Sequence, residues 1–489
     1  MEENPKYFNP DNKVIEWVKN HEELFLAACL LHDVGHAPFS HTSEEFYRPD
    51  EEEFKRLFAN AINNDSKLIT DKKKNQKAKA HEQMSVIVAL KTFRSYFKKW
   101  SDEADFFARC ITGYKYTDPG DIKTEKFMVK NCIIELLNSS IIDVDKLDYI
   151  IRDAFVSGFQ SVNIDYNRLL EGIVIILENN IFKLAYHKSA ISVIQNVLYA
   201  HDFSKEWIQT HPSIIYEDYL IEHCINNIER YFSSQNEIKN KLFSYDALTE
   251  KGIAFGDNPT GITNISLLSD SDILFFIKNM KQCQDPLTHE YFNRNSRRHP
   301  IWKSEDEFEF FTGIHKDGKI LKAPEESGNI IEIFKGLEKL LEGFIKSGCE
   351  ILPVIDEKLY KVMLVESKKD NSQIFEKDTL KKNIEYLKII KEFAKEQEIP
   401  FDFIIRFRSK FISNFSAEKI DTKNIKIWYP HEPQIELTSR LKTLSAEDRA
   451  DYFYLYYRRK EKNKKITVSD FCNLCDKLRS KYKELHKPI

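Results

Sequence analysis

Residues 30–46 read LLHDVGHAPFSHTSEEF, and this stretch decides how the first part of the chain is expected to fold. Apolar side chains recur at helical spacing across residues 14–33, which predicts an amphipathic helix. Gly35 and Pro38 break that spacing, so a tight loop is expected directly after Asp33. The sequence therefore predicts a helix that runs into a histidine-rich loop.

The composition is that of a globular protein. The chain has 489 residues, which exceeds one simple core and predicts two or three domains. Apolar residues make up 42% and charged residues 31%, a balance that excludes a disordered chain. Basic residues number 73 and acidic residues 77, so the net charge of -4 argues against a surface built wholly for nucleic acid.

The chain also lacks the signals of a membrane or secreted protein. No apolar run approaches the ~20 residues that a membrane span needs, and the start, MEENPKYFNPDNK, does not resemble a signal peptide. Eight scattered cysteines are typical of reduced thiols rather than of a disulfide framework. We therefore expect a cytoplasmic protein that has no membrane partner.

The pattern of apolar residues predicts a mainly α fold with three regions. Residues 1–235 contain few glycines and prolines and are expected to form one all-helical domain, with residues 66–80 as an exposed lysine-rich loop. Residues 236–347 are expected to extend it with further helices. Residues 348–489 combine helical spacing with β-like runs at 348–366, 401–411 and 424–430, which predicts a small α/β appendage with a helical C-terminal region.

Candidate chemistry concentrates around the His32-Asp33 pair. Where a helix ends and the backbone turns, an adjacent imidazole and carboxylate can face one divalent cation. Four of the 14 histidines fall within about fifty residues: His32, His36, His41 and His81. A second acidic cluster, IDVDKLDYIIRD, places Asp145 and Tyr149 on one helical face. Each histidine alone would be read as a core or capping residue, but the joint pattern favours a site.

Three blocks in this order resemble a known family. They are LLHDVGHAPFSHTSEEF, then AHEQMSV, then SSIIDVDKLDYIIRDAFVSGFQSVNIDYNRLL, and the resemblance covers about residues 22–170. They look like the HD-domain deoxynucleoside triphosphate triphosphohydrolases, which include the dGTPase-like enzymes and the vertebrate dNTPase with a sterile-alpha-motif domain. The resemblance implies an HD-domain helical core and metal-dependent hydrolysis of a dNTP to deoxynucleoside and triphosphate.

The resemblance also implies a role for each matching residue. Asp145 and the His32-Asp33 pair would bind Mg2+, Mn2+ or Fe2+. His41 would be the catalytic histidine, oriented by Glu44. The further active-site residues are His36 and His81 facing the phosphates, Lys146 neutralising phosphate charge, Tyr149 packing on the deoxyribose and Asp153 bonding the 3′ hydroxyl. Family members are oligomers, which implies a homo-oligomer and leaves room for a nucleotide effector.

Two features depart from the family. Its first metal ligand is a histidine in an Arg-x-x-His block, which is absent here. His21 lies eleven residues before His32, about 16 Å along a helix, so both cannot bind one ion. Either the start lies upstream, or three ligands suffice, or the metal binds poorly. In residues 200–211, the family's arginine and tyrosine are replaced by His201 and Gln209, and Lys205 is one substitute for the arginine.

Two alternative functions stay open. One is an HD phosphohydrolase for another nucleotide or a phosphodiester, and the other is a non-catalytic HD scaffold that binds nucleotide and regulates. Weaker candidates lie further along the chain. Residues 452–465 interleave aromatic and basic residues, which is compatible with nucleic acid but favours a helix with one buried aromatic face. The lone pair Cys472 and Cys475 does not favour zinc, and Arg294, Arg297 and Arg298 fit an anion site or a solvated loop equally well.

Overall fold

The computed structural model describes most of the chain. Its described residues are 6–7, 12–47, 52–64, 66–74, 78–121, 124–139, 142–158, 163–234, 242–254, 264–316, 319–321, 324–346, 377–407, 425–429, 435–436, 452–458 and 465–486. The chain divides into two compact units. The first comprises residues 1–209, 218–288 and 412–447, and the second comprises residues 210–217, 289–411 and 448–489.

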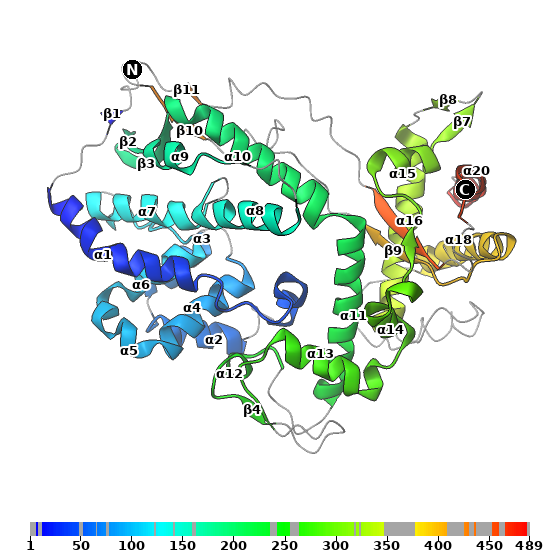
Figure 1. Ribbon diagram of the computed structural model, residues 1–489, viewed down its shortest axis with the longest axis horizontal. Helices are drawn as coiled ribbons and strands as arrows, with labels where there is room; N and C mark the ends of the chain where they lie inside the picture. Colours follow the sequence, from blue (N-terminus) through cyan, green and yellow to red (C-terminus); the bar gives the residue numbers. More distant parts are fainter. Residues whose placement is uncertain are drawn as a thin grey trace. The chain divides into compact units, whose positions relative to one another are not determined.

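Helices form most of the first unit. In chain order they are α1 (Asn12–Leu31), the short helix η1 (Ser40–Tyr47), α2 (Glu52–Ala61), α3 (Ser66–Lys74), α4 (Ala80–Thr92), α5 (Arg94–Phe97), α6 (Ala104–Thr112), α7 (Glu125–Leu137), α8 (Val144–Val156), α9 (Tyr166–Glu171), α10 (Ile191–Phe203), α12 (Tyr245–Leu248) and α13 (Asp270–Asn279). Helix α6 packs against α1, α4 and α7, and α8 packs against α7 and α10 (Figure 1). The site described below lies where α1, η1, α4 and α8 meet.

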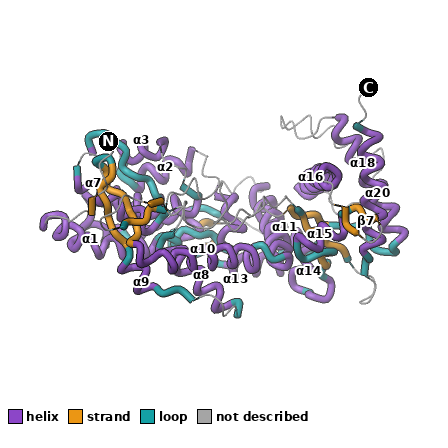
Figure 2. The backbone as a smooth tube through the Cα atoms, turned by 90° about the horizontal axis from the view of Figure 1, so that it is seen from above, coloured by secondary structure: helices purple, strands orange, loops and turns teal. Residues whose placement is uncertain are grey.

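A five-stranded sheet covers one side of α7 (Figures 1 and 2). Its order is β1 (Lys6–Tyr7), β2 (Ile173–Glu178), β3 (Ile181–His187), β10 (Lys426–Trp428) and β11 (Ile435–Glu436). Strand β10 runs parallel to β3, with Ile427 opposite Tyr186, and the other pairs are antiparallel. A late segment of the chain therefore completes a sheet begun near the N-terminus.

The expectation of an all-helical domain over residues 1–235 is wrong because of the β2–β3 hairpin. Both strands are rich in β-branched and aromatic residues. The two residues between them, Asn179 and Asn180, have φ of 52° and 60°. Two consecutive left-handed residues match the tight turn that joins twisted antiparallel strands, and asparagine tolerates that conformation well. Phe182 of β3 is buried against Met128 and Cys132 of α7.

The second unit is built on a three-stranded antiparallel sheet of order β6 (His299–Pro300), β12 (Phe453–Tyr457) and β9 (Ile404–Phe407). Its helices include α15 (Glu305–Thr312), α16 (Pro324–Lys346), α18 (Lys377–Glu396) and α20 (Val468–Leu485), of which the last three pack on one another. Helices α11 (Pro212–Ser234) and α14 (Pro286–Phe292) contribute residues to both units. Two short hairpins are β4 (Ile253–Ala254) with β5 (Asn264–Ile265) and β7 (Ile314–Lys316) with β8 (Lys319–Leu321).

The expectation that residues 452–465 form a helix is wrong in its described part. Residues 453–457 are the central strand β12, and all five side chains are buried. A central strand is covered on both faces, so its sequence reads as a continuous apolar run rather than as an alternation. The aromatic side chains of this segment fill the core of the second unit, where Phe453 contacts Trp302 and Phe334.

The expected mainly α class is confirmed. Helix α3 occupies part of the expected loop at residues 66–80, and Leu68 anchors it with no exposed surface. The two units do not follow the expected boundaries at residues 235 and 347, since residues 412–447 belong with the N-terminal unit. The expected strand run at 348–366 lies outside the described residues. Among the described helices, none has the length and apolar character needed to cross a membrane.

Candidate metal centre

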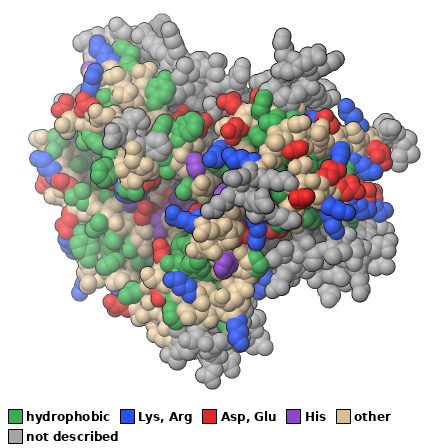
Figure 3. All heavy atoms as spheres, turned by 45° about the vertical axis from the view of Figure 1, so that its right-hand side comes forward, with side chains coloured by type: hydrophobic (Ala, Val, Ile, Leu, Met, Phe, Trp, Pro, Cys, Tyr) green, Lys and Arg blue, Asp and Glu red, His purple; other side chains and the backbone are tan. Residues whose placement is uncertain are grey.

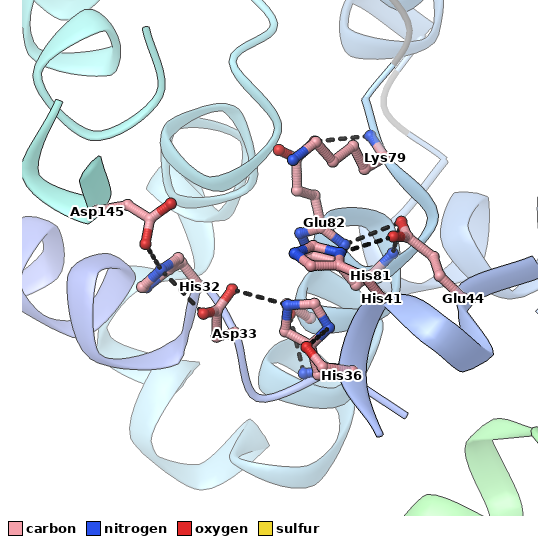
Figure 4. Close-up of polar contacts among 12 residues, drawn as sticks. His32, Asp33, His36, His41, Glu44, Lys79, His81, Glu82 and Asp145 are labelled. Atoms are coloured by element: carbon pink, nitrogen blue, oxygen red, sulfur yellow. Dashed lines mark hydrogen bonds and ion pairs between the residues drawn. The ribbon is translucent and has the colours of Figure 1, made fainter. Parts of the chain in front are cut away.

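A trio of His32, Asp33 and Asp145, called the carboxylate trio below, lies where the end of α1 meets the start of α8 (Figure 4). His32 Nε2 is 3.4 Å from Asp33 Oδ2 and 3.3 Å from Asp145 Oδ1. One ligand atom from each residue falls within 4.8 Å of the other two. One imidazole nitrogen and two carboxylate oxygens form a donor set that suits Mn2+, Fe2+ or Mg2+.

Local structure aims these side chains at one point. Helix α1 ends at Leu31, so His32 Nδ1 reaches back 2.8 Å to donate to the carbonyl of Cys29. That bond leaves Nε2 as the atom facing the two carboxylates, which is how metal-binding histidines are commonly held. On the other side, Asp143 caps α8 by accepting from Lys146 N at 2.7 Å. Asp145 therefore lies in the first turn of a fixed helix.

The charges of this trio depend on one another. Burial lowers the pKa of His32, but the hydrogen bond to Asp145 and the charge of Asp33 outweigh it and raise the pKa to about 9. Burial raises the pKa of Asp33, but His36 and His32 together lower it to about 2. Burial raises the pKa of Asp145, but the hydrogen bond and the charge of His32 outweigh burial and lower it. Without a cation, the trio is an imidazolium between two carboxylates.

A second trio of His36, His41 and His81, called the histidine trio below, lies beside the first. One ring nitrogen of each histidine falls within 4.8 Å of the other two. The rings of His36 and His81 stack at 4.0 Å between centroids. Glu44 holds two of the three, because its carboxylate accepts from His41 Nδ1 at 3.1 Å and from His81 Nδ1 at 2.9 Å.

Asp33 joins the two trios. Its Oδ2 faces His32, while its Oδ1 lies 3.4 Å from His36 Nε2 (Figure 4). The exposure of the histidines differs sharply, because the His41 side chain is 65% exposed and that of His81 is 6% exposed. A ligand arriving from solvent would therefore meet His41 first. Figure 3 shows histidine side chains at the surface of one face, among interspersed acidic and basic groups.

The loop between the trios is held by contacts that sequence reasoning missed. The Gly35 N–H donates to Ser85 Oγ of α4 at 2.9 Å, and the Gly35 carbonyl accepts from Tyr47 at 2.5 Å. Phe39 and Ser40 follow with φ of 61° and 51°, a left-handed pair that costs free energy in residues other than glycine. Asp270 stabilises this turn, since it accepts from the Phe39 N–H at 2.9 Å. A partner 231 residues away gives no local sequence signal.

The residues predicted to bind substrate lie on α8 but differ in how far neighbouring residues engage their side chains. Asp145, Tyr149 and Asp153 are spaced at four-residue intervals and so share one face of the helix. Tyr149 is partly buried against the core cluster around α8 and α10. Lys146 is tied locally, because its Nζ donates to the Ser139 carbonyl at 2.6 Å and to Asp143 at 2.5 Å. The structure thus places Lys146 in the cap of its own helix.

The other candidates from the sequence lie outside the two trios. His21 lies within helix α1, and its ring stacks on that of Trp17 at 4.1 Å between centroids. Its Nε2 lies 3.4 Å from Glu103 Oε1. Arg297 pairs with Glu217, and Arg298 is buried between Glu290 and Asp402. Arg297 and Arg298 are therefore engaged in ion pairs within the protein, whereas Arg294 is exposed. His201, Lys205 and Gln209 lie at the end of α10 and in the π-helical segment that follows it, η5 (Ser204–Gln209), which contacts α8. Cys472 contacts the Phe311 carbonyl.

Gly35→Ala is expected to damage the carboxylate trio. A Cβ at this position would lie 2.2 Å from Ser85 N and 2.5 Å from Met84 C, both backbone atoms of α4, so the loop must move. We expect a loss of about 1–3 kcal/mol in stability and at least a tenfold loss in Mn2+ affinity, measured by thermal unfolding and calorimetric titration. Gly120→Ala is the control, since its Cβ meets only Asp118 Oδ1 at 3.1 Å. Unchanged Mn2+ affinity in Gly35→Ala would contradict the assigned role of the loop.

Asp145→Ala is expected to abolish high-affinity binding of Mn2+, because it removes one of the two carboxylates that face His32. The matched control is Asp148→Ala, one turn along the same helix, where the carboxylate pairs with Arg152 at 2.6 Å. Calorimetry and metal analysis after gel filtration should show one Mn2+ lost only in the first variant. Equal binding by both variants would place the cation elsewhere.

The affinity for Mn2+ is expected to rise with pH between 6 and 8. The pKa of His32 is about 9 without a cation, so His32 carries a proton in this range and must release it to coordinate. The low pKa of Asp33 means that its carboxylate is already ionised. We expect about one proton released per ion, seen as a dependence of the binding heat on the buffer. A binding heat and affinity that do not vary with buffer or pH would exclude His32 as a ligand.

Comparisons with known proteins give relatives but no family. No family model matches the chain. It is 30% identical over 155 residues to the uncharacterized protein YwfO of Bacillus subtilis, covering 32% of this chain and 26% of that protein. It is 22% identical over 246 residues to the uncharacterized protein MG461 of Mycoplasma genitalium, covering 47% and 50% respectively. The Mycoplasma pneumoniae homolog matches at 25% over 181 residues, 37% of this chain and 35% of that protein. The chain thus spans at most half the length of these relatives.

Proposed function

We propose that this protein hydrolyses deoxynucleoside triphosphates to deoxynucleoside and triphosphate with a divalent cation, as an HD-domain phosphohydrolase. One observation carries the proposal. A donor set for a hard cation and a carboxylate-held histidine lie side by side and share Asp33, whose two oxygens face His32 and His36. Phosphoester hydrolysis needs this pairing, because one group must offset phosphate charge while another protonates the leaving oxygen.

The carboxylate trio would hold the cation, and the chemistry supplied there is polarisation of a phosphate oxygen. Mn2+, Mg2+ and Fe2+ all suit its donors. His32, Asp33 and Asp145 are three protein ligands, which leaves coordination positions for substrate, as in open catalytic sites. The set therefore fits a catalytic centre without the further histidine of the family pattern.

His41 would deliver the proton to the 5′ oxygen of the leaving nucleoside. Its Nδ1 is bonded to Glu44, so its Nε2 is the nitrogen left to meet the substrate. Burial raises the pKa of Glu44, but His41 and His81 outweigh burial and hold it well below its usual range. Glu44 therefore stays a carboxylate and favours the protonated imidazole that a general acid requires.

Helix α8 would carry the contacts to the sugar. Asp145, Tyr149 and Asp153 lie in line along one face, and eight residues of helix span about 12 Å. Tyr149 would pack on the deoxyribose and Asp153 would accept from the 3′ hydroxyl. The resemblance also implies a homo-oligomer, and we propose a cytoplasmic location.

A second candidate is hydrolysis of another nucleotide or a phosphodiester. Lys146 favours it, because its ammonium is engaged by Asp143 and Ser139 rather than directed at a triphosphate. A substrate with fewer phosphate charges would need that lysine less. The non-catalytic alternative would bind nucleotide or a partner and regulate without turnover.

His41→Ala is expected to lower kcat for triphosphate release by about 100-fold or more while leaving Mn2+ binding intact. Purified protein would be incubated with each dNTP and Mn2+, and products resolved by ion-exchange chromatography. His289→Ala is the control, since His289 is exposed and its ring is hydrogen-bonded to Ser296. No product from any dNTP by Mn2+-loaded wild-type protein would refute the dNTP proposal, and turnover of another phosphoester would favour the second candidate.

A further inference from the structure

A tight turn directly after His36 interrupts the histidine trio. The Ser40 N–H donates to the Ala37 carbonyl at 2.8 Å and closes this turn. Pro38 occupies its second position, and Phe39 occupies the third with φ of 61°. A proline followed by a positive φ is typical of a type II turn, whose third position favours glycine. Phe39 is therefore held in a conformation that its own side chain disfavours.

A type I turn would suit the same residues better. It differs from type II in the orientation of the peptide between the second and third residues, and it gives the third residue a negative φ. Negative φ is the ordinary conformation of a phenylalanine. Contacts from outside the turn are therefore needed to keep the peptide between Pro38 and Phe39, called the central peptide below, in its observed orientation.

Both polar groups of the central peptide are hydrogen-bonded. The Pro38 carbonyl accepts from Ser43 Oγ, which belongs to η1, the helix that the turn itself begins. The Phe39 N–H donates to Asp270 Oδ1 at 2.9 Å, and Asp270 lies in the first turn of α13. Of these two partners, Asp270 is the one on a separate helix. A carboxylate is a strong acceptor for a backbone N–H, so this bond ties the turn to α13.

The direction of η1 depends on this turn. The helix begins at Ser40, whose φ of 51° is also left-handed, and His41 follows at once. Ser40 Oγ lies 3.2 Å from His36 Nδ1, and His41 Nδ1 lies 3.1 Å from Glu44 Oε2. The rings of His36 and His41 are 5.0 Å apart between centroids. Reversal of the central peptide would redirect the start of η1 and so move His41 relative to His36.

We propose that Asp270 is a positioning residue for the acid–base histidines. Its bond to the Phe39 N–H holds the central peptide in the type II orientation, and that orientation places His41 beside Glu44 and His36. The effect on catalysis rests on the function proposed above, whereas the placement of His41 does not. Asp270 contributes no group to the reaction and acts through the backbone alone.

The first test is kinetic. Asp270→Ala is expected to lower kcat for triphosphate release about 10 to 100-fold through misplacement of His41. Its Mn2+ affinity should stay unchanged, because Ser85 and Tyr47 hold Gly35 between the turn and the carboxylate trio. Asp270→Asn should keep most of the activity, since the asparagine side-chain oxygen still accepts a hydrogen bond.

Two further variants separate this role from a general effect on α13. Asp272→Ala is the matched control, because it removes a 2.8 Å bond to the Ser269 N–H at the start of the same helix and leaves the bond of Phe39 in place. Phe39→Gly in the Asp270→Ala protein should raise kcat again by about threefold or more, since glycine adopts a positive φ freely. Phe39→Gly alone controls for loss of the phenylalanine ring.

The second test does not require turnover. Full-length protein labelled with 15N-histidine would be compared by NMR, and the His41 signal is the one lost in His41→Ala. Because Glu44 bonds His41 Nδ1, its 15N shift reports whether that bond is kept. The shift is expected to move in Asp270→Ala and to stay at the wild-type position in Asp270→Asn and Asp272→Ala.

The outcomes distinguish this inference from the proposed function. An altered His41 signal in Asp270→Ala supports the placement even if the wild-type protein hydrolyses no nucleotide, a result that would contradict the hydrolase alone. An unaltered His41 signal in Asp270→Ala overturns the inference. Equal kcat losses in Asp270→Ala and Asp272→Ala, or no recovery on adding Phe39→Gly, would show that Asp270 supports α13 in general and would also overturn it.

Discussion

The candidate centre depends on where the carboxylate of Asp33 is held. Its two oxygens face different imidazoles, one in each trio, so a small displacement of this residue would break both groups at once. Three constraints fix it. Helix α1 ends at Leu31, Gly35 is pressed against the backbone of α4, and Ser85 and Tyr47 bond both polar groups of Gly35. The packing of three helices thus decides the chemistry of one side chain.

Much of the site could be anticipated because its residues cluster in the sequence. The helix predicted over residues 14–33 is present as α1, which ends two residues earlier than predicted, and the residues assigned to the metal and to acid–base roles come together in space. Their roles stay predictions. The turn at Phe39 and Ser40 could not be predicted, since neither residue favours a left-handed backbone and its partner, Asp270, lies in a distant helix. Lys146 was assigned by resemblance, and its local bonds to the cap of α8 were missed.

The fold errors share one physical cause. Local spacing reports which side chains are apolar, but it does not report what covers them. The aromatic run of β12 is buried on both faces and therefore reads like a helix face in the sequence. The β2–β3 hairpin interrupts a run of helices, and its local signals are the β-branched and aromatic residues of its strands and the Asn179-Asn180 turn. Strand β10, which pairs with β3, lies about 240 residues later in the chain. The sheet therefore depends on a pairing that no local pattern encodes.

The positive charge of protonated His32 explains how such a centre can fold without a cation. Asp33, Asp145 and Glu44 place three carboxylates among four imidazoles, and neighbouring carboxylates repel one another unless positive charge lies between them. The raised pKa of His32 shows the remedy, since a proton on the ring takes the place of a positive ion between Asp33 and Asp145. In the proposed function, a divalent cation entering this trio replaces the His32 proton, and its second charge offsets the remaining negative charge of the two carboxylates. On that proposal, the affinity for the cation is set by a competition between metal and proton at His32.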